Sequence, residues 1–348
     1  MPPERTVLVC EAQVPFVQGG AEFHVRELVR QLRAHGHQTE LVSVPFKWYP
    51  KSEILAHATA WRLLDLSECN GRAVDLVIAT KFPTYFVRHP NKVAWLIHQY
   101  RAAYELTGTP FSDFTHTEED VALRERIVAL DTAMLGECRR IFANAGNTAG
   151  RAARFNGVAA EALYHPPRLA DRLQAGNARA YVLSIGRLEA VKRVDLAIGA
   201  MAHAPKDLEL VIAGTGTQRI ALETLAAQLG VGDRVRFVGE ASDDLIVELY
   251  AGALGVIFPP YDEDYGYVTL EAFLSHKPVV TTTDAGGPNE FVEDGVNGWV
   301  TAPDAAAIGA AIGRLDADRA RARAMGEAGY ERARTITWDG VIEKLIGR

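Results

Sequence analysis

Cysteines are few and long apolar runs are absent from this sequence of 348 residues. The three cysteines, Cys10, Cys69 and Cys138, lie far apart and form no CxxC pair, which excludes a disulfide framework and a cysteine zinc site. No apolar run reaches the ~18 residues of a spanning helix. The first residues, MPPERTVLVC, do not resemble a secretory signal peptide. We therefore expect a protein of the reducing cytoplasm.

An excess of basic charge is also lacking in the second half of the chain. Residues 1–170 contain 19 lysines and arginines against 18 aspartates and glutamates, whereas residues 171–348 contain 18 against 26. The second half lacks the basic footprint of nucleic-acid-binding proteins, and we predict no nucleic-acid partner. The first half, with eight of the ten histidines, is compatible with peripheral contact at the inner face of a membrane. Ordinary variation between domains explains its charge equally well.

Short apolar segments alternate with amphipathic helical patterns along the whole chain. This alternation predicts an α/β fold with parallel sheets covered by helices on both faces. The predicted strands are 6–10, 39–44, 75–80, 92–98 and 140–145, and then 181–186, 208–214, 234–239, 254–258 and 278–283. We predict two doubly wound Rossmann-like domains, residues 1–165 and 181–317, facing each other across a cleft. A linker at 166–180 would join them, and a helical tail at 318–348 would pack back on the body.

One segment after a predicted strand, YDEDYGYVTLEA at 261–272, combines a glycine with two glutamates. Ligands bind at the carboxyl ends of strands in such sheets. If a helix begins near Gly266 and Tyr267, its unpaired N–H groups can hold a phosphate oxygen. Glu263 can accept hydrogen bonds from sugar hydroxyls, and Glu271, about one turn into the helix, can accept two from a ribose diol. A nucleotide sugar presents these parts in the same order.

Cations and glycines at other strand ends suit a diphosphate. Arg187 and Lys192 stand at a strand–helix junction, where a guanidinium fork and an ammonium point charge can hold phosphates. Gly19 and Gly20 precede a predicted helix and permit close approach of the backbone to an anion. The IAGTGT segment, with Gly214, lacks the third glycine of a dinucleotide fingerprint, which weighs against NAD. Each of these patterns also occurs as an ordinary turn or as surface charge.

A single histidine, His98, ends the predicted strand KVAWLIH in the first half. A histidine in this place is usually structural. If His98 lies opposite the second domain, it is instead a candidate catalytic or substrate-contacting group.

These motifs occur together and in one order: GGAE at 19–22, GRLEAVKR at 186–193, IAGTG at 212–216, RFVG at 236–239, the two glutamates at 263 and 271, and GGPNE at 286–290. In this order they resemble the retaining nucleotide-sugar glycosyltransferases of family 4, which have the GT-B fold. The resemblance extends from residue 7 to about residue 300 and is closer in the second half. It implies transfer of a sugar from a nucleoside-diphosphate sugar to a carbohydrate or lipid-linked acceptor, in the synthesis of cell-surface polysaccharides or glycolipids.

The resemblance also implies a role for each matching position. Arg187 and Lys192 would hold the donor diphosphate, and Glu271 would bind the ribose. Glu263 would contact the transferred sugar, and His98 would lie near that sugar where the acceptor enters. The further implied contacts are Gly19, Gly20, Gly186 and Gly214 at strand ends, Phe237 and Val238 beside the base, and Tyr265, Gly266, Tyr267 and Val268 around the distal phosphate.

We expect neither a metal ion nor another cofactor, because Arg187, Lys192 and a helix N-terminus can stabilise the leaving diphosphate. The DED at 262–264 overlaps Glu263 and is the one competing acidic motif. The sequence departs from the family pattern at Tyr265, where a phenylalanine is usual. The added hydroxyl either contacts the donor or is only solvated. It departs again after His98, where residues 99–106 contain no aspartate, and this leaves the acceptor side open.

Four alternatives remain. A nucleotide-sugar epimerase of the same fold would need acid and base residues that we cannot identify, and an oxidoreductase would need the missing glycine. A non-catalytic sugar-nucleotide-binding protein would not need Glu263, Lys192 and His98 together. The fourth alternative is a transferase that acts on a soluble small-molecule acceptor. The donor base and the donor sugar are left open.

Overall fold

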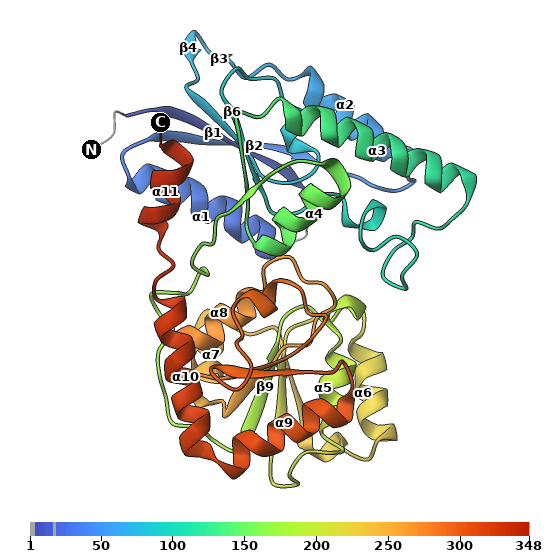
Figure 1. Ribbon diagram of the computed structural model, residues 1–348, viewed down its shortest axis with the longest axis vertical. Coiled ribbons are helices and arrows are strands. Elements are labelled where there is room, and N and C mark those ends of the chain that lie inside the picture. Colours follow the sequence, from blue (N-terminus) through green and yellow to red (C-terminus); the bar gives the residue numbers. More distant parts are fainter. Residues whose placement is uncertain (1–3, 17–18, 348) are drawn as a thin grey trace. The chain divides into compact units, whose positions relative to one another are not determined.

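The computed structural model describes residues 4–16 and 19–347. Within it the chain forms two compact units. Unit 1 contains Met1–Arg168 together with Trp338–Arg348, and unit 2 contains Leu169–Thr337 (Figure 1). Each unit has its own sheet and its own hydrophobic core.

The sheet of unit 1 has six parallel strands in the order β2-β1-β5-β6-β7-β8. Their bounds are β1 Thr6–Gln13, β2 Gln38–Pro45, β5 Leu76–Ala79, β6 Lys92–Leu96, β7 Arg140–Ala143 and β8 Glu161–Ala162. The central strands β5 and β6 are buried at every position, as expected of strands covered on both faces. The edge strand β2 is mostly exposed or half-buried.

Helices follow most of these strands. The α-helices of unit 1 are α1 Gly20–Ala34, α2 Glu53–Leu63, α3 Glu118–Gly136, α4 Gly146–Asn156 and α11 Trp338–Ile346, with short 3-10 turns η1 Thr84–Phe86 and η2 Arg101–Ala103. A two-stranded antiparallel ribbon joins β3 Glu68–Cys69 to β4 Arg72–Ala73. Helix α1 places Val25, Leu28 and Leu32 in the core, on the face that the apolar spacing predicted.

Unit 2 repeats this plan. Its parallel sheet has the order β11-β10-β9-β12-β13-β14, with β9 Tyr181–Ile185, β10 Glu209–Ala213, β11 Val235–Gly239, β12 Gly255–Ile257, β13 Val279–Thr282 and β14 Gly298–Thr301. Its helices are α5 Val194–Ala200, α6 Arg219–Gln228, α7 Asp243–Gly252, α8 Tyr267–Leu274, α9 Ala305–Ala317 and α10 Arg319–Ala333, with the 3-10 turns η3 Ala190–Lys192, η4 Gly232–Arg234 and η5 Gly287–Glu290. Figure 1 shows α5 and α6 on one side of β9, and α7 and α8 on the other.

The C-terminal tail is divided between the two units. Helix α10 belongs to unit 2, where Gly326 lies against the backbone of His276 and Gly329 against the ring of Phe273. Helix α11 belongs to unit 1, and the side chains of Trp338 and Leu345 join the core beneath α1. The prediction treated 318–348 as one tail. Its apolar residues are too few to show which sheet each helix covers.

The segment predicted as a linker lies mostly on unit 2. Leu169 and Leu173 are buried, Arg179 N donates to Gly252 O, and Lys277 Nζ donates to Gly176 O at 2.7 Å. These contacts connect the segment to α7 and to the start of β13. The predicted α/β class with two parallel Rossmann-like sheets is confirmed. Within residues 4–16 and 19–347, no helix has the length and apolarity needed to cross a membrane.

Candidate active site

The predicted donor-binding residues of unit 2 follow the carboxyl ends of four adjacent strands. Gly239 ends β11, Gly214 follows β10, Gly186 follows β9, and residues 258–266 follow β12. Residues far apart in the sequence therefore share one edge of the sheet, which is where ligands bind in such folds.

Gly186 and Gly214 allow two of these loops to touch. Both have a positive φ, +137° and +133°. A Cβ on Gly214 would lie 1.9 Å from the carbonyl oxygen of Gly186, and the amide of Gly214 donates to Gly239 O at 2.7 Å. Gly214 thus lies against the backbone of Gly186, and together these contacts hold the ends of β9, β10 and β11 together.

Lys192 and Glu263 form an ion pair. Lys192 Nζ lies 2.5 Å from Glu263 Oε2, and the two side chains are 17% and 15% exposed. Lys192 ends the 3-10 turn η3 after β9, whereas Glu263 lies in the loop after β12. The structure therefore brings a predicted diphosphate ligand directly beside a predicted sugar ligand.

The neighbouring Arg193 anchors the loop that carries Glu263. Its guanidinium donates to the carbonyls of Pro259 and Pro260 and makes a bidentate ion pair with Asp284, at 2.6 and 2.9 Å. Burial alone would raise the pKa of the Asp284 carboxyl, but the hydrogen bonds and charge of Arg193 outweigh it and lower the pKa. We did not predict this role for Arg193. The GRLEAVKR motif places it beside Lys192 but does not show what it contacts.

Backbone hydrogen bonds join the Glu263 loop to the GGPNE segment. Glu263 N donates to Ala285 O at 2.7 Å, and Gly287 N donates to Glu263 O at 2.8 Å. A Cβ on Gly287 would meet Asp264 O at 2.5 Å. The conformation that presents Glu263 therefore depends on a glycine at 287.

Helix α8 begins at Tyr267, as the sequence predicted. Gly266 is its N-cap in the left-handed region, with φ +81°, and a Cβ there would lie 2.8 Å from Pro288 Cγ. The first N–H groups of a helix have no acceptor within that helix, and at the start of α8 these groups belong to Tyr267 and Val268. The side chain of Tyr265 is 2% exposed and packs edge-on against Tyr267 and Phe291. This burial rules out the alternative of a merely solvated hydroxyl.

Glu271 is oriented by a buried tyrosine that we did not predict. Tyr250 Oη, from α7, donates to Glu271 Oε2 at 2.7 Å. Burial and then the Glu271 charge raise the pKa of Tyr250 well above its usual range, so the phenol remains a donor. The ELYAG segment around Tyr250 predicts only an apolar helix. The hydrogen bond from Tyr250 to Glu271 joins α7 to α8, and no pattern within either helix shows that the two will pack together.

The other predicted side chains of unit 2 are Arg187, Phe237 and Val238. Arg187 is exposed, and none of the described residues receives a hydrogen bond or ion pair from its side chain. Phe237, with Val238 in β11, is half-buried beneath Arg219, whose guanidinium carbon is 4.4 Å from the ring centroid. No group of three or more His, Cys, Asp or Glu side chains in residues 4–16 and 19–347 could hold a metal ion.

The remaining predicted residues, Gly19, Gly20 and His98, lie in unit 1. Gly19 caps α1 in an extended conformation that any residue can adopt, and Gly20 is the first helical residue. Near this helix start, Lys81 Nζ and Glu22 Oε1 form a buried pair at 2.8 Å. Burial of Glu22 would raise its pKa, but the Lys81 charge outweighs it and lowers the pKa. The predicted strand 92–98 ends at Leu96, so His98 lies in the following loop, where Nδ1 donates to Gln99 O at 2.7 Å.

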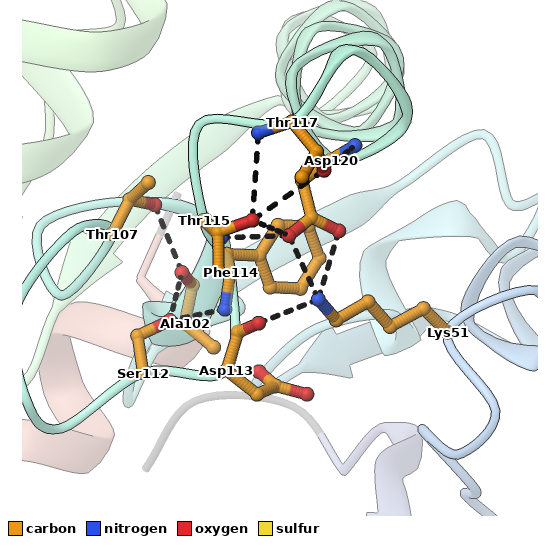
Figure 2. A network of polar contacts seen from close by, with 9 residues as sticks. All are labelled: Lys51, Ala102, Thr107, Ser112, Asp113, Phe114, Thr115, Thr117 and Asp120. Atoms are coloured by element: carbon orange, nitrogen blue, oxygen red, sulfur yellow. Dashed lines mark hydrogen bonds and ion pairs between the residues drawn. The ribbon is translucent and has the colours of Figure 1, made fainter.

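The loop after His98 is held by the polar network in Figure 2. Lys51 Nζ donates to Asp113 O and to both carboxylate oxygens of Asp120, at 2.8 and 2.9 Å, and lies 4.6 Å from the centroid of the Phe114 ring. Thr115 adds hydrogen bonds to Asp120 from its amide and hydroxyl. Hydrogen bonds from Lys51 and Thr115, together with the Lys51 charge, lower the Asp120 pKa to about 2. Lys51 thereby connects this loop to the start of α2.

Residues 168–332 match the family model described as Glycosyl transferases group 1. The D-inositol 3-phosphate glycosyltransferase of Salinispora tropica is 34% identical over 182 residues, which are 48% of this chain and 38% of that protein. The alpha-D-kanosaminyltransferase of Streptomyces kanamyceticus is 36% identical over 128 residues, 36% of this chain and 33% of the relative. The match therefore spans less than half the length of either relative.

Solved structures resemble the chain over nearly its whole length. A sucrose-phosphate synthase from Thermosynechococcus elongatus has a TM-score of 0.75 at 20% identity and covers 98% of this chain and 97% of its own. Anabaena HepE in complex with UDP and glucose has a TM-score of 0.73 at 16% identity, covering 99% and 98%. The chain therefore has the GT-B fold of these proteins, and its residues 168–332 resemble the group 1 glycosyl transferases. The resemblance inferred from the motifs is confirmed.

Proposed function

We propose that this protein is a retaining glycosyltransferase that moves a sugar from a nucleoside-diphosphate sugar to an acceptor hydroxyl without a metal ion. One observation carries the proposal: in a domain that matches the group 1 family, the Lys192–Glu263 pair, the start of α8 and Glu271 lie on one sheet edge. Glu263 matches the sugar of such a donor, Lys192 and the start of α8 match its phosphates, and Glu271 matches its ribose.

The ion pair suggests how the donor is received. A diphosphate oxygen can replace Glu263 as the partner of Lys192, and a sugar hydroxyl can donate to the carboxylate in place of the ammonium. Both charges then keep a partner. This matters because the side chains of Lys192 and Glu263 are only 17% and 15% exposed, and a charge in such a place is costly without a partner. Arg187 and the N–H groups at the start of α8 add positive charge beside the phosphates.

The same groups stabilise the leaving group in the transfer step. The bond between the anomeric carbon and the phosphate oxygen breaks, and its electron pair goes to the diphosphate. A bond forms between that carbon and the acceptor oxygen on the face that the diphosphate leaves, which retains the configuration. The acceptor proton passes to a phosphate oxygen. Preorganised cations act where this charge develops, which is the reason we propose metal independence.

We propose a carbohydrate or lipid-linked acceptor of the cell surface, reached through unit 1 at the inner face of the membrane. A small soluble acceptor is the second candidate. It is favoured by the names of the sequence relatives, one of which is a transferase of D-inositol 3-phosphate.

A melting-temperature screen with UDP, GDP, ADP, dTDP, NAD and their sugar conjugates, with and without a chelator, tests the donor class. A ligand at about a hundred times its dissociation constant stabilises the fold by ~2.7 kcal/mol. Stabilisation by one nucleoside diphosphate in the presence of the chelator is expected. Stabilisation by NAD alone would instead identify an oxidoreductase.

Product analysis then tests the reaction. We expect Glu263→Ala to abolish turnover and the product to keep the anomeric configuration of the donor in its proton NMR spectrum. An epimerase would convert the sugar without any acceptor, and a non-catalytic binder would show no turnover before mutation. An inverted product would refute retention while leaving sugar transfer intact.

A further inference from the structure

A cavity of about 370 Å³ lies at the amino ends of two neighbouring strands of unit 1. Its floor is formed by Thr6 and Leu8 of β1 and by their partners in the ladder, Gln38 and Glu40 of β2. Since alternate residues of a strand share one face of the sheet, these four side chains point to the same side. Ligands in folds of this kind bind at the carboxyl ends of the strands, so the cavity does not belong to that edge.

The antiparallel ribbon of β3 and β4 borders this floor. Asn70 and Gly71 have φ values of +52° and +74°, as one type of two-residue hairpin turn requires. The turn pairs Cys69 with Arg72, and side chains directly opposite each other in an antiparallel pair share one face. Both residues line the cavity, and Arg72 Nη1 donates to Gln38 Oε1. This hydrogen bond connects the ribbon to the floor.

Two guanidinium groups line the cavity, those of Arg33 and Arg72. Arg33 Nε donates to Thr39 O at 2.8 Å, and its Nη2 lies 3.3 Å from Glu40 Oε1. The Glu40 side chain is 78% exposed, so this ion pair is weak. None of the carboxylates that the structure describes pairs with Arg72. Because a guanidinium has five N–H donors, both arginines retain donors for a further acceptor.

The charge of the lining favours an anion. Glu40 is its one carboxylate, against the two guanidinium groups. The lining also includes His37, which is 4% exposed. Burial, followed by the charges of Arg5 and His35, lowers the pKa of His37, so the ring is neutral near pH 7. A carboxylate or phosphate group, which a guanidinium can hold through two parallel hydrogen bonds, matches this arrangement.

The remainder of the lining is largely apolar. Val7, Leu8 and Val74 are buried and contribute to the wall. Pockets for small molecules have volumes of roughly 300–1,000 Å³ and combine apolar walls with a few polar groups that fix the orientation. The volume of this cavity lies within that range and suits a small molecule that has both an anionic group and an apolar part.

We propose that this cavity is a binding site for a small organic anion, separate from the donor-binding edge of unit 2. Arg33 and Arg72 hold its carboxylate or phosphate group, and its apolar part lies against Leu8 and Val74. The anion replaces Glu40, whose side chain is largely exposed, as the partner of Arg33. All of these groups belong to unit 1, and the inference does not depend on the proposed function.

Cys69 offers a direct measurement of binding, because it is exposed and lines the cavity. The full chain is treated with iodoacetamide, a neutral reagent, and the modification of Cys69 is followed by peptide mass spectrometry. Benzoate and phenyl phosphate serve as probes, with inorganic phosphate as the anionic group alone and potassium chloride as the control for ionic strength. We expect benzoate or phenyl phosphate to slow the modification several-fold and in a saturable way. The more effective of the two identifies the anionic group as carboxylate or phosphate.

Substitutions test whether the arginines hold the probe. Arg33→Gln and Arg72→Gln should each raise the concentration for half protection about tenfold, as expected on losing a hydrogen bond to a charged group. Arg126→Gln is the matched control, since Arg126 is an exposed residue of α3 outside the cavity, and it should leave this concentration unchanged. Each variant is compared with its own rate without probe, so a change in the basal reactivity of Cys69 does not affect the result. The inference is wrong if no probe protects Cys69 at millimolar concentrations, if potassium chloride protects equally, or if both arginine variants are protected like the wild type.

Discussion

Replacing Asp131 by asparagine should change how the stability of unit 1 depends on pH. Asp131 lies in α3 with no solvent exposure, and Tyr104 Oη donates to its Oδ2 at 2.6 Å. Among the described residues, its Oδ1 has no hydrogen-bond partner. An asparagine oxygen can accept from Tyr104 in the same way, so the substitution removes the titration while keeping the shape and the hydrogen bond.

The magnitude follows from the pKa of the carboxyl. Burial raises the pKa of Asp131 from 3.8 to about 7, against the lowering effect of the hydrogen bond from Tyr104 and of the nearby Tyr85 hydroxyl. A difference of ~3 units corresponds to about 4 kcal/mol. The folded state holds the proton more tightly than the unfolded state. The contribution of Asp131 to the stability of the wild type is therefore greatest below pH ~4, and about 4 kcal/mol of it is lost as the pH rises through about 7.

Urea unfolding of both proteins between pH 4 and pH 8 measures this effect. Tryptophan fluorescence reports mainly on unit 1, which contains Trp48, Trp61, Trp95 and Trp338, whereas unit 2 contains only Trp299. The unfolding free energy of Asp131→Asn minus that of the wild type should increase by about 4 kcal/mol across this range and level off above pH ~7. A difference that stays constant with pH would refute a protonated Asp131.

Three further substitutions test unit 2. Lys192→Ala should slow transfer by roughly two to three orders of magnitude, as expected on losing one electrostatic stabiliser, and a steady-state change below about threefold would remove Lys192 from the site. Tyr250→Phe deletes only the hydrogen bond to Glu271 and should weaken nucleoside-diphosphate binding about tenfold in calorimetry, because hydrogen bonds to charged groups contribute ~1.5–3 kcal/mol; an unchanged Kd would mean that Glu271 is oriented by other contacts. Gly214→Ala should lower the melting temperature far more than Gly230→Ala, because both have positive φ but a Cβ at Gly230 meets nothing within 4 Å; equal losses would contradict the loop contact at Gly186.

Much of the fold could be predicted because it depends on local pattern. Apolar runs of strand length alternate with helical spacing, and this indicated both parallel sheets. The start of α8 was predicted at Gly266 and Tyr267, since a glycine in the left-handed region is a local signal for a helix end. The division of the tail was not predicted, because α10 and α11 differ in which sheet they cover and not in their own pattern.

The contacts within the site depended on tertiary structure. Lys192 and Glu263 are 71 residues apart, Arg193 and Asp284 are 91 apart, and Tyr250 and Glu271 are 21 apart. Each residue could be assigned to a strand end or a helix, but no local pattern shows which side chains will meet.

The sequence alone determined the fold class, because strand and helix patterns depend on neighbouring residues, and its motifs indicated the type of enzyme through their resemblance to a known family. Only the tertiary structure decided which groups hold the donor-binding edge of unit 2 in place: Arg193 beneath the Glu263 loop and Tyr250 behind Glu271. Supporting contacts of this kind join distant elements, and they exist only after the sheets and helices have packed.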